Sequence, residues 1–426
     1  MACPDPATLV SQLDEFIVGQ DTAKKVIAVA VRDRWRRMHV VDTQLRNRIT
    51  PSNILLTGPT GSGKTEIARR LAGFIKAPFV KVVATRYTEE GFVGDKVNSC
   101  IEELAEQAYT DEAKLMKDEF TQQAYSIALE EIARAYISAK KAGTNSQAQV
   151  VAMIRAGLIS DDELEIASIK NKEITYLRDL HWTSPKMTVA DAVRLSTDHH
   201  ASKLFKAAEP ELKERARFSA ENRGIVFIDE FDKLVEDEDS NHNDGGFRAK
   251  RRGVQKELLS LIEGTDVLTP KLGKVSTEHI LFICAGAFSL TKPTHMMPEL
   301  FGRIPVQANL RPLSKQDLEL ILTTIKHPLP VQHAALLQAD GVDVQFTPEG
   351  LAEIAAAAFY LNDQKVNTGA RRLQQIFNWV LEDIKFQGSA LQGQKVVVGE
   401  AEVKARLGTP EISPLFQGTN YSKFVI

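Results

Sequence analysis

The stretch NILLTGPTGSGKTEIA, residues 53–68, decides the fold. An apolar run leads into a glycine-rich turn of the form GxxxxGK(S/T), and the turn leads into a run of helix-forming residues. In this order the glycines let backbone N–H groups converge on phosphate oxygens, and the N-terminus of the following helix adds partial positive charge. Lys64 can then reach the β- and γ-phosphates of a nucleotide, and the Thr65 hydroxyl can ligate Mg²⁺. The stretch therefore predicts a strand, a phosphate-binding loop and a helix that together hold ATP with Mg²⁺; a glycine-rich turn without a ligand is the alternative.

Three further short runs have the character of strands that are buried on both faces. They are residues 79–83 (FVKVV), 224–228 (GIVFI) and 279–285 (HILFICA). Their apolar residues are continuous rather than alternating, which is typical of a parallel sheet with helices on both sides. The predicted fold class is therefore α/β.

Two carboxylates, Asp229 and Glu230, follow directly after the GIVFI run. A strand end beside the phosphate loop is the place where a metal-bound nucleotide meets water. There Asp229 suits Mg²⁺, and Glu230 suits the polarisation of an attacking water. Carboxylates at strand ends also occur as solvated turn residues, so it is the phosphate loop that favours the catalytic interpretation.

The length and texture of the chain predict more than one domain. At roughly 150 residues per domain, 426 residues hold about two or three packed cores. Residues 101–220 contain only two glycines and two prolines and should be mostly helical. We expect a helical insertion at 109–186 inside a discontinuous α/β nucleotide-binding domain at 1–108 and 187–311. A small, mainly helical C-terminal domain should then occupy 312–426, with Pro312 near its boundary.

The composition excludes several classes of protein. The 53 basic and 56 acidic residues give a net charge of −3, so no global positive field draws the chain to nucleic acid or anionic lipid. The longest uncharged apolar stretch, residues 280–291, is too short to span a membrane, and no signal peptide is evident. The three cysteines are far apart and form no CxxC pair, which is unlike a disulfide framework or a zinc site. We expect a cytoplasmic protein that binds neither membrane nor nucleic acid.

Several motifs together resemble a known family. The phosphate loop, the FIDE strand and arginines in GR and GAR settings are similar to those of AAA+ ATPases of the Clp/Hsp100 type. Closer still is the HslU (ClpY) family, whose members act as unfoldases for the separate threonine peptidase HslV. This resemblance rests on FIVGQ (16–20), AVRDRWRR (30–37), GFVG (91–94), GVQKELL (253–259) and YSKFVI (421–426). It covers almost the whole chain apart from the insertion.

The resemblance implies roles for residues whose spacing alone says little. Without it, Arg303 and Arg371 read as solvated surface charges. With it, Arg303 becomes a finger that reaches the γ-phosphate in a neighbouring subunit, and Arg371 becomes a sensor that couples the small domain to nucleotide. Val18 would line the adenine pocket, and Glu299 would lie near the nucleotide. The phosphates would be held by Gly61, Ser62, Gly63, Lys64, Thr65 and Glu66.

The resemblance also implies a homo-hexameric ring that pulls unfolded or tagged protein substrates through its centre. The gripping loop would be Gly91, Phe92, Val93 and Gly94, in which an aromatic and an aliphatic residue sit on a backbone that glycines allow to move. Without the family, a turn with Phe92 in the core is the simpler interpretation. The apolar C-terminal residues Phe424, Val425 and Ile426 would dock into an HslV-type threonine peptidase, with a frayed tail as the alternative.

The sequence also bears on alternative functions. The chain shows no nucleophile elbow and no HExxH motif, so proteolysis has to come from a partner. A stand-alone remodelling ATPase without a peptidase is the alternative function. A DNA motor is disfavoured because the basic clusters at 34–37 and 248–252 lack interleaved aromatic residues. Many AAA+ proteins carry a polar residue that orients the attacking water where this chain has Ala285.

Overall fold

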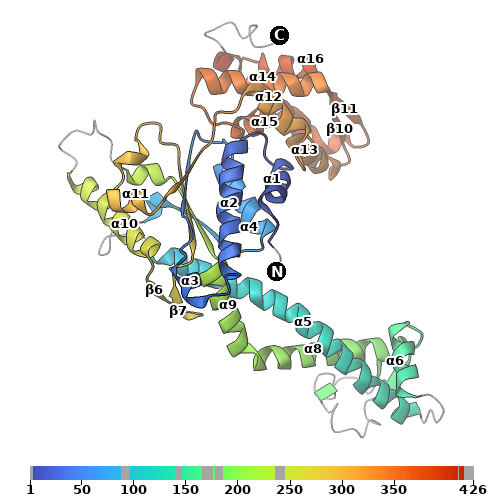
Figure 1. Ribbon diagram of the computed structural model, residues 1–426. Helices are drawn as coiled ribbons and strands as arrows, with labels where there is room; N and C mark the ends of the chain where they lie inside the picture. Colours follow the sequence, from blue (N-terminus) through green and yellow to red (C-terminus); the bar gives the residue numbers. More distant parts are fainter. Residues whose placement is uncertain are drawn as a thin grey trace. The chain divides into compact units, whose positions relative to one another are not determined.

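The computed structural model describes residues 3–87, 96–140, 146–165, 176–177, 186–235, 245–410 and 412–416 (Figure 1). The chain divides into two compact units. One comprises residues 1–104, 219–269 and 274–426, and the other comprises residues 105–218 and 270–273. The segment predicted as an insertion, 109–186, falls within the second unit.

A five-stranded sheet forms the centre of the first unit. Its strand order is β2-β5-β8-β1-β9, and every neighbouring pair is parallel. The order places β1 and β5 on either side of β8, so the phosphate loop after β1 and the carboxylates after β5 leave the same edge of the sheet. This confirms the predicted α/β fold class. The strands are β1 (Ile54–Thr57), β2 (Phe79–Val83), β5 (Ile225–Asp229), β8 (Leu281–Gly286) and β9 (Val306–Asn309).

The fifth strand, β9, was not among the predicted strands. It lies at the edge of the sheet and pairs only with β1. Only Ala308 of its four residues is buried, because one side of an edge strand faces solvent. Such a strand lacks the continuous apolar run that identified the other four.

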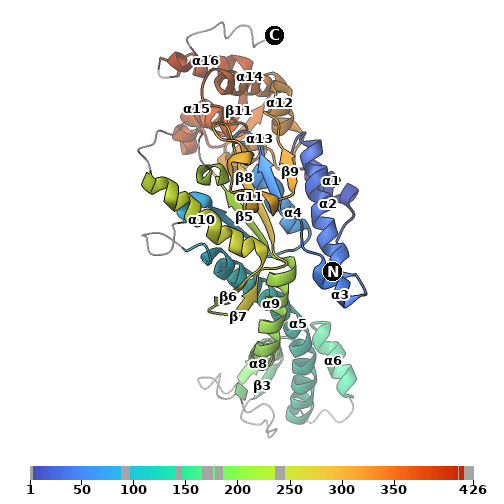
Figure 2. The ribbon, with the colours of Figure 1, turned by 60° about the vertical axis from the view of Figure 1, so that its left-hand side comes forward.

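Helices cover the sheet because both of its faces are apolar. Alternate strand residues such as Leu56, Phe227 and Ile283 share one buried cluster with residues of the N-terminal helices. Side chains of the opposite strand face, including Leu55 and Phe282, are also fully buried. Figure 2 shows α2 on one side of the strands and α10 on the other. The helices of this region are α1 (Pro6–Asp14), α2 (Asp21–Met38), α3 (Thr43–Arg48), α4 (Lys64–Phe74), α10 (Gly245–Glu263) and α11 (Pro298–Gly302).

The chain after β9 forms a second hydrophobic cluster with helices around a two-stranded parallel sheet. Ala-rich α14 (Pro348–Gln364) packs against α12, α15 and α16. Thr347 and Ser314 cap α14 and α12 with their hydroxyl oxygens, which accept backbone N–H bonds of the first turn. The other elements are α12 (Lys315–Thr323), α13 (Leu329–Gln338), β10 (Asp343–Phe346), α15 (Arg371–Gln387), β11 (Lys395–Val398) and α16 (Glu400–Leu407).

The second unit is helical, as its low glycine and proline content predicts. Its cluster of buried residues includes Leu129, Ile132, Val150, Met187 and Val193. The elements are α5 (Ser99–Lys140), α6 (Gln147–Arg155), α8 (Val189–Ala207) and α9 (Glu209–Arg223), with a short antiparallel pair, β3 (Glu163–Glu165) and β4 (Lys186–Thr188). A further short pair, β6 (Asp266–Thr269) and β7 (Gly273–Ser276), belongs to the first unit except for Gly273. Across the described residues, no helix is both long enough and apolar enough to cross a bilayer.

Candidate functional site

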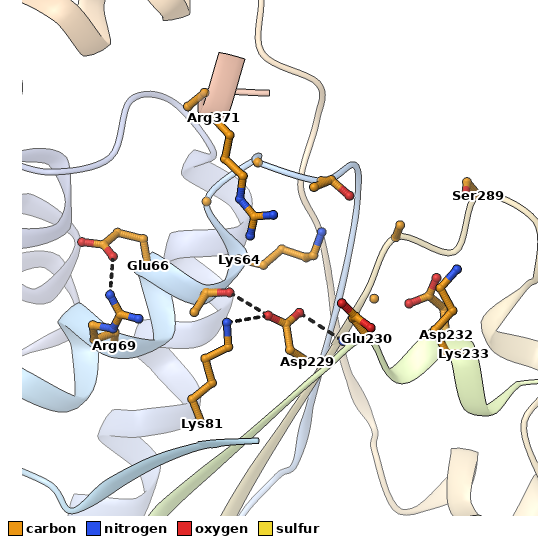
Figure 3. Close-up of a pocket in the computed structure, with 17 residues that line it drawn as sticks. Lys64, Glu66, Arg69, Lys81, Asp229, Glu230, Asp232, Lys233, Ser289 and Arg371 are labelled. Carbon is orange, nitrogen blue, oxygen red and sulfur yellow. Dashed lines mark hydrogen bonds and ion pairs between the residues drawn. The ribbon is translucent and has the colours of Figure 1, made fainter. Parts of the chain in front are cut away.

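A cavity of about 570 Å³ opens at the carboxyl edge of the sheet, where β1, β5 and β8 end (Figure 3). Its walls come from the phosphate loop, the carboxylates after β5, the segment after β8 and the start of α15. Among the described residues, most of the lining side chains are charged or polar. The lining residues are Thr60, Gly61, Gly63, Lys64, Thr65, Glu66, Arg69, Lys81, Asp229, Glu230, Asp232, Lys233, Gly286, Ala287, Ser289, Ala370 and Arg371.

The phosphate loop has the backbone that its glycines predict. Gly61 and Gly63 have φ values of +73° and +104°, a region that favours glycine, and α4 begins directly after them at Lys64. The helix therefore points its unpaired N–H groups at the cavity. Ser62 is different from its neighbours, because its side chain is buried and does not line the cavity.

The Lys64 ammonium lies inside this loop. Its Nζ donates to the carbonyl oxygens of Gly58 and Pro59 at 2.6 and 2.9 Å. Burial lowers the pKa of Lys64, while the nearby carboxylates of Asp229 and Asp232 counteract that lowering. A lysine in this place is a mobile positive charge that can exchange two carbonyl oxygens for phosphate oxygens.

Asp229 stands at the end of β5 with both oxygens occupied. One oxygen accepts from the Thr65 hydroxyl at 3.2 Å and from Lys81 Nζ at 2.9 Å, and the other accepts from the Glu230 N–H at 3.1 Å. Burial alone would raise the pKa of Asp229, but the Lys81 bond and charge, together with the other two bonds, lower it overall. The Thr65 hydroxyl and this carboxylate form a pair of hard oxygen donors, which is the kind of ligand that Mg²⁺ takes.

Glu230 is exposed and lines the cavity beside Asp229. Its φ of +56° is rare for a residue with a side chain. Backbone strain of this sort costs about 1–3 kcal/mol and persists where the surroundings hold it, often at functional sites. The turn ends β5 abruptly, starts the 3₁₀ helix Phe231–Leu234, and leaves the Glu230 carboxylate at the cavity.

Arg371 reaches the cavity from the first residue of α15 and extends toward Lys64 in Figure 3. The turn before it packs directly on the phosphate loop, where the Ala370 N–H donates to the Gly61 carbonyl at 3.1 Å. A Cβ atom on Gly61 would lie 1.9 Å from the Thr368 oxygen, so only glycine permits this approach. The buried Asn362 holds the turn by donating to the Gly369 carbonyl and accepting from the Thr368 N–H, both at 3.0 Å.

Three residues with predicted nucleotide roles lie away from this cavity. Arg303 ends α11 and forms an ion pair with Glu263, with Nη2 3.0 Å from Oε1. Glu299 is exposed in the first turn of the same helix. Val18 is half-buried in the turn before α2. None of them lines the cavity within this chain.

Other cavity residues did not emerge from the sequence. Lys81 could have been identified as a site residue from the sequence, because it is the one charged residue in the apolar FVKVV strand. Arg69, Asp232, Lys233 and Ser289 carry no comparable pattern. Ala285, the position considered for orienting water, is fully buried in the sheet, and the chain first reaches the cavity at Gly286.

Two predicted functional segments cannot be placed. Gly91, Phe92, Val93 and Gly94 lie outside the described residues, as do Phe424, Val425 and Ile426. Their proposed roles in gripping substrate and in docking a peptidase stay predictions.

Comparison with known proteins is consistent with the geometry of the cavity. Residues 53–142 match the AAA domain family of the dynein-related subfamily, and residues 162–307 match the AAA domain family of the Cdc48 subfamily. The ATP-dependent protease ATPase subunit HslU of Persephonella marina is 39% identical to this chain, and the similarity covers 95% of each of the two proteins. The chain belongs to the HslU family of AAA+ ATPases.

Proposed function

We propose that the protein is an ATP-dependent unfoldase and translocase, the hexameric ring subunit that feeds polypeptide to a separate HslV-type threonine peptidase. The observation that carries this proposal is the convergence of Lys64, Thr65, Asp229 and Glu230 on one cavity. These four side chains supply a phosphate-binding cation, two metal ligands and a carboxylate that can polarise water.

The residues of the chain divide the work of hydrolysis among them. Lys64 and the N–H groups of the loop bind the phosphates. Thr65 and Asp229 would hold Mg²⁺, which would neutralise developing charge on the phosphates. Glu230 accepts the proton of the attacking water, and Ser289, which lines the same cavity, is a candidate to orient that water. Val18, Glu299 and Arg303 do not line the cavity of their own chain. Arg303 and Glu299 would then serve the site of a neighbouring subunit in a homo-hexamer.

Parts of the chain outside the cavity would bind substrate, dock the peptidase and sense nucleotide. The Gly91–Gly94 loop grips unfolded or tagged substrates, and the Phe424–Ile426 tail docks the peptidase. Arg371 senses nucleotide on behalf of the C-terminal region, 312–426, and the helical insertion at 109–186 meets substrate. The contact between Ala370 and Gly61 supports the sensor role, because it joins the turn that carries Arg371 to the phosphate loop.

A substitution of Glu230 by glutamine tests the proposal. Glutamine keeps the size of the side chain but cannot accept a proton, so we expect ATPase activity to fall about 10²- to 10⁴-fold while ATP still binds. Steady-state phosphate release and binding of a fluorescent ATP analogue measure the two effects. The matched control is Glu214→Gln on exposed α9, which should leave both unchanged. Hydrolysis at the normal rate in the Glu230 variant would show that the catalytic assignment is wrong.

A further inference from the structure

Gln20 occupies an unusual position at the start of α2. It precedes the helix with φ 64° and ψ 29°, the left-handed region, and its side chain makes no capping bond to the helix. It is only 5% exposed. A buried amide in a strained backbone is unfavourable unless all of its polar groups are bonded, so the partners of this side chain are informative.

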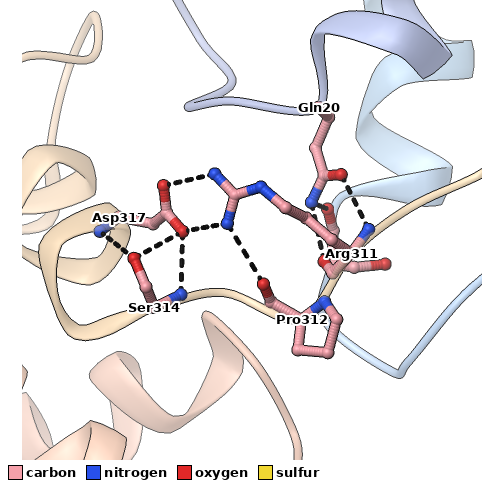
Figure 4. A network of polar contacts seen from close by, with 6 residues as sticks. Gln20, Arg311, Pro312, Ser314 and Asp317 are labelled. Atoms are coloured by element: carbon pink, nitrogen blue, oxygen red, sulfur yellow. Dashed lines mark hydrogen bonds and ion pairs between the residues drawn. The ribbon is translucent and has the colours of Figure 1, made fainter.

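The Gln20 amide is bonded to two segments far away in the sequence (Figure 4). Its Nε2 donates to the Arg311 carbonyl at 2.9 Å, and its Oε1 accepts from the Arg311 N–H at 3.0 Å. Nε2 also faces the Ser62 carbonyl of the phosphate loop at 3.5 Å. The side chain is thus held firmly by Arg311 and only at the limit of a hydrogen bond by Ser62.

Arg311 also contacts α12, through its guanidinium. It follows β9, and its guanidinium forms a two-point ion pair with Asp317, at 2.5 and 2.8 Å. Asp317 in turn accepts from the backbone N–H and hydroxyl of Ser314, which caps the helix. The Arg311 bond, followed by the Ser314 bonds, lowers the pKa of Asp317 to about 2 against the effect of burial. The two-point ion pair therefore ties Arg311 to the first turn of α12.

The contact between Gln20 and Ser62 is weaker than the contacts between Gln20 and Arg311. The Ser62 N–H donates to the Pro59 carbonyl at 3.4 Å, and the buried Ser62 hydroxyl has no hydrogen-bond partner among the described residues. Pro59 also accepts from Lys64 Nζ, at 2.9 Å. When Lys64 turns to phosphate oxygens it releases Pro59, so the position of the Ser62 peptide depends on whether the loop holds phosphate.

We propose that Gln20 is a positioning residue that links the phosphate loop, through Arg311 and Asp317, to the first turn of α12. A shift of the Ser62 carbonyl on nucleotide binding shortens or breaks its contact with Gln20, and the firm bonds to Arg311 carry that change toward Asp317. The linkage is separate from Arg371, which reaches the cavity from α15. It rests on the proposed function only in requiring that the loop binds nucleotide.

Hydrogen exchange with and without ADP tests the linkage, because ADP occupies the site without turnover. In the wild-type protein we expect ADP to change the exchange rates of the amides at 311–318. In Gln20→Met, which keeps the length but none of the polar groups, saturating ADP should no longer change them. In this variant the dissociation constant of ADP should also rise about 5- to 150-fold, the range typical of two coupled sites. Gln44→Met, on the exposed face of α3, is the matched control and should behave as wild type.

Asp317→Asn tests the far end of the linkage independently of how well the Gln20 variant folds. Coupling is reciprocal, so this change should also weaken ADP binding although Asp317 does not line the cavity. In the double variant the two losses should not multiply, since both act through one connection. Multiplying losses, an unchanged ADP affinity in Asp317→Asn, or an unchanged exchange response in Gln20→Met would each overturn the linkage alone. A wild-type protein that binds no ADP would overturn the proposed function as well.

Discussion

At the scale of single residues, the site depends on how charges are placed around Asp229. Lys81 lies 2.9 Å from an Asp229 oxygen and keeps this half-buried carboxyl ionised. The same oxygen accepts from the Thr65 hydroxyl, so the cation keeps the proposed metal ligand in its charged form. This explains why a lone lysine interrupts an otherwise apolar strand.

Replacing Lys81 by methionine should make ATP hydrolysis more sensitive to acid. Loss of the ammonium removes the main influence that lowers the pKa of Asp229, so that pKa rises while burial continues to raise it. Because the ionised form is the active one, kcat/KM should fall at a higher pH on acidification than in the wild type. A pH profile of kcat/KM reports this group in the free enzyme. Lys25→Met, on the exposed side of α2, should leave the acid limb in place, and a limb that also stays in place for Lys81→Met would contradict the role of this lysine.

At the scale of elements, one buried arginine joins a helix to the start of two strands. Arg34 of α2 donates to the carbonyls of Asn222 and Arg223 at the end of α9, at 3.1 and 3.2 Å. It also donates to the carbonyls of Gly224 before β5 and His279 before β8, at 3.0 and 2.9 Å. Burial lowers the pKa of Arg34 to about 9, and the neighbouring Arg37 and Arg223 charges contribute to the lowering. The guanidinium thus donates to carbonyls at the end of a helix, where the last carbonyls have no partner within the helix itself.

Removing this arginine should loosen the region from which β5 begins. Arg34→Met removes one donor from each of four carbonyls, of which the Gly224 carbonyl keeps the Leu281 N–H at 3.1 Å, and we expect a loss of about 3 kcal/mol in the opening free energy of the amides at 222–226. Native-state hydrogen exchange measures that energy locally. Arg34→Lys should lose less, since an ammonium keeps the charge but cannot span four carbonyls. The exposed Arg36, paired only with Asp33 among the interactions of the described residues, is the control, and Arg36→Met should stay within about 0.5 kcal/mol of wild type.

At the scale of the whole molecule, the described residues contain at least three separate hydrophobic clusters. One surrounds the parallel sheet, one lies among α12 to α16, and one lies in the helical second unit. Arg303 is held by Glu263 away from the cavity of its own chain. The proposed finger role of Arg303 therefore requires the proposed ring, in which a neighbouring copy would supply the arginine.

Truncation of the last three residues tests the proposed partner. Removal of Phe424–Ile426 should leave ATPase activity within about twofold of wild type, while degradation of an unfolded protein by an added HslV-type peptidase should fall at least about tenfold. Each 1.4 kcal/mol of docking energy is worth tenfold in affinity, and burial of an apolar tail of this size exceeds that. Replacing Ser422 and Lys423 by alanine while keeping the apolar end is the control and should preserve degradation. Undiminished degradation after the truncation would favour the stand-alone remodelling ATPase.

Four strands, the phosphate loop and the carboxylates Asp229 and Glu230 could be read from the chain before any fold was known. Each of these features depends on a short continuous segment of sequence, because a buried parallel strand needs a continuous apolar run and a phosphate loop needs glycines at set intervals. The observed strands begin and end within one or two residues of the predicted runs. The proposed roles of Arg303 and Arg371, in contrast, rest on family resemblance and not on a local pattern.

The remaining features were decided by contacts between distant segments. Edge strand β9 exists because β1 offers a partner, and its own residues carry almost no apolar signal. Gln20 and Arg311 lie 291 positions apart, and Lys81 meets Asp229 only because β2 and β5 pair in one register. Amide and ion-pair partners of this kind leave no local periodicity, since any polar residue on a solvated surface would look the same in the chain. Only the packed sheet and the turns at its carboxyl edge determine which of them meet.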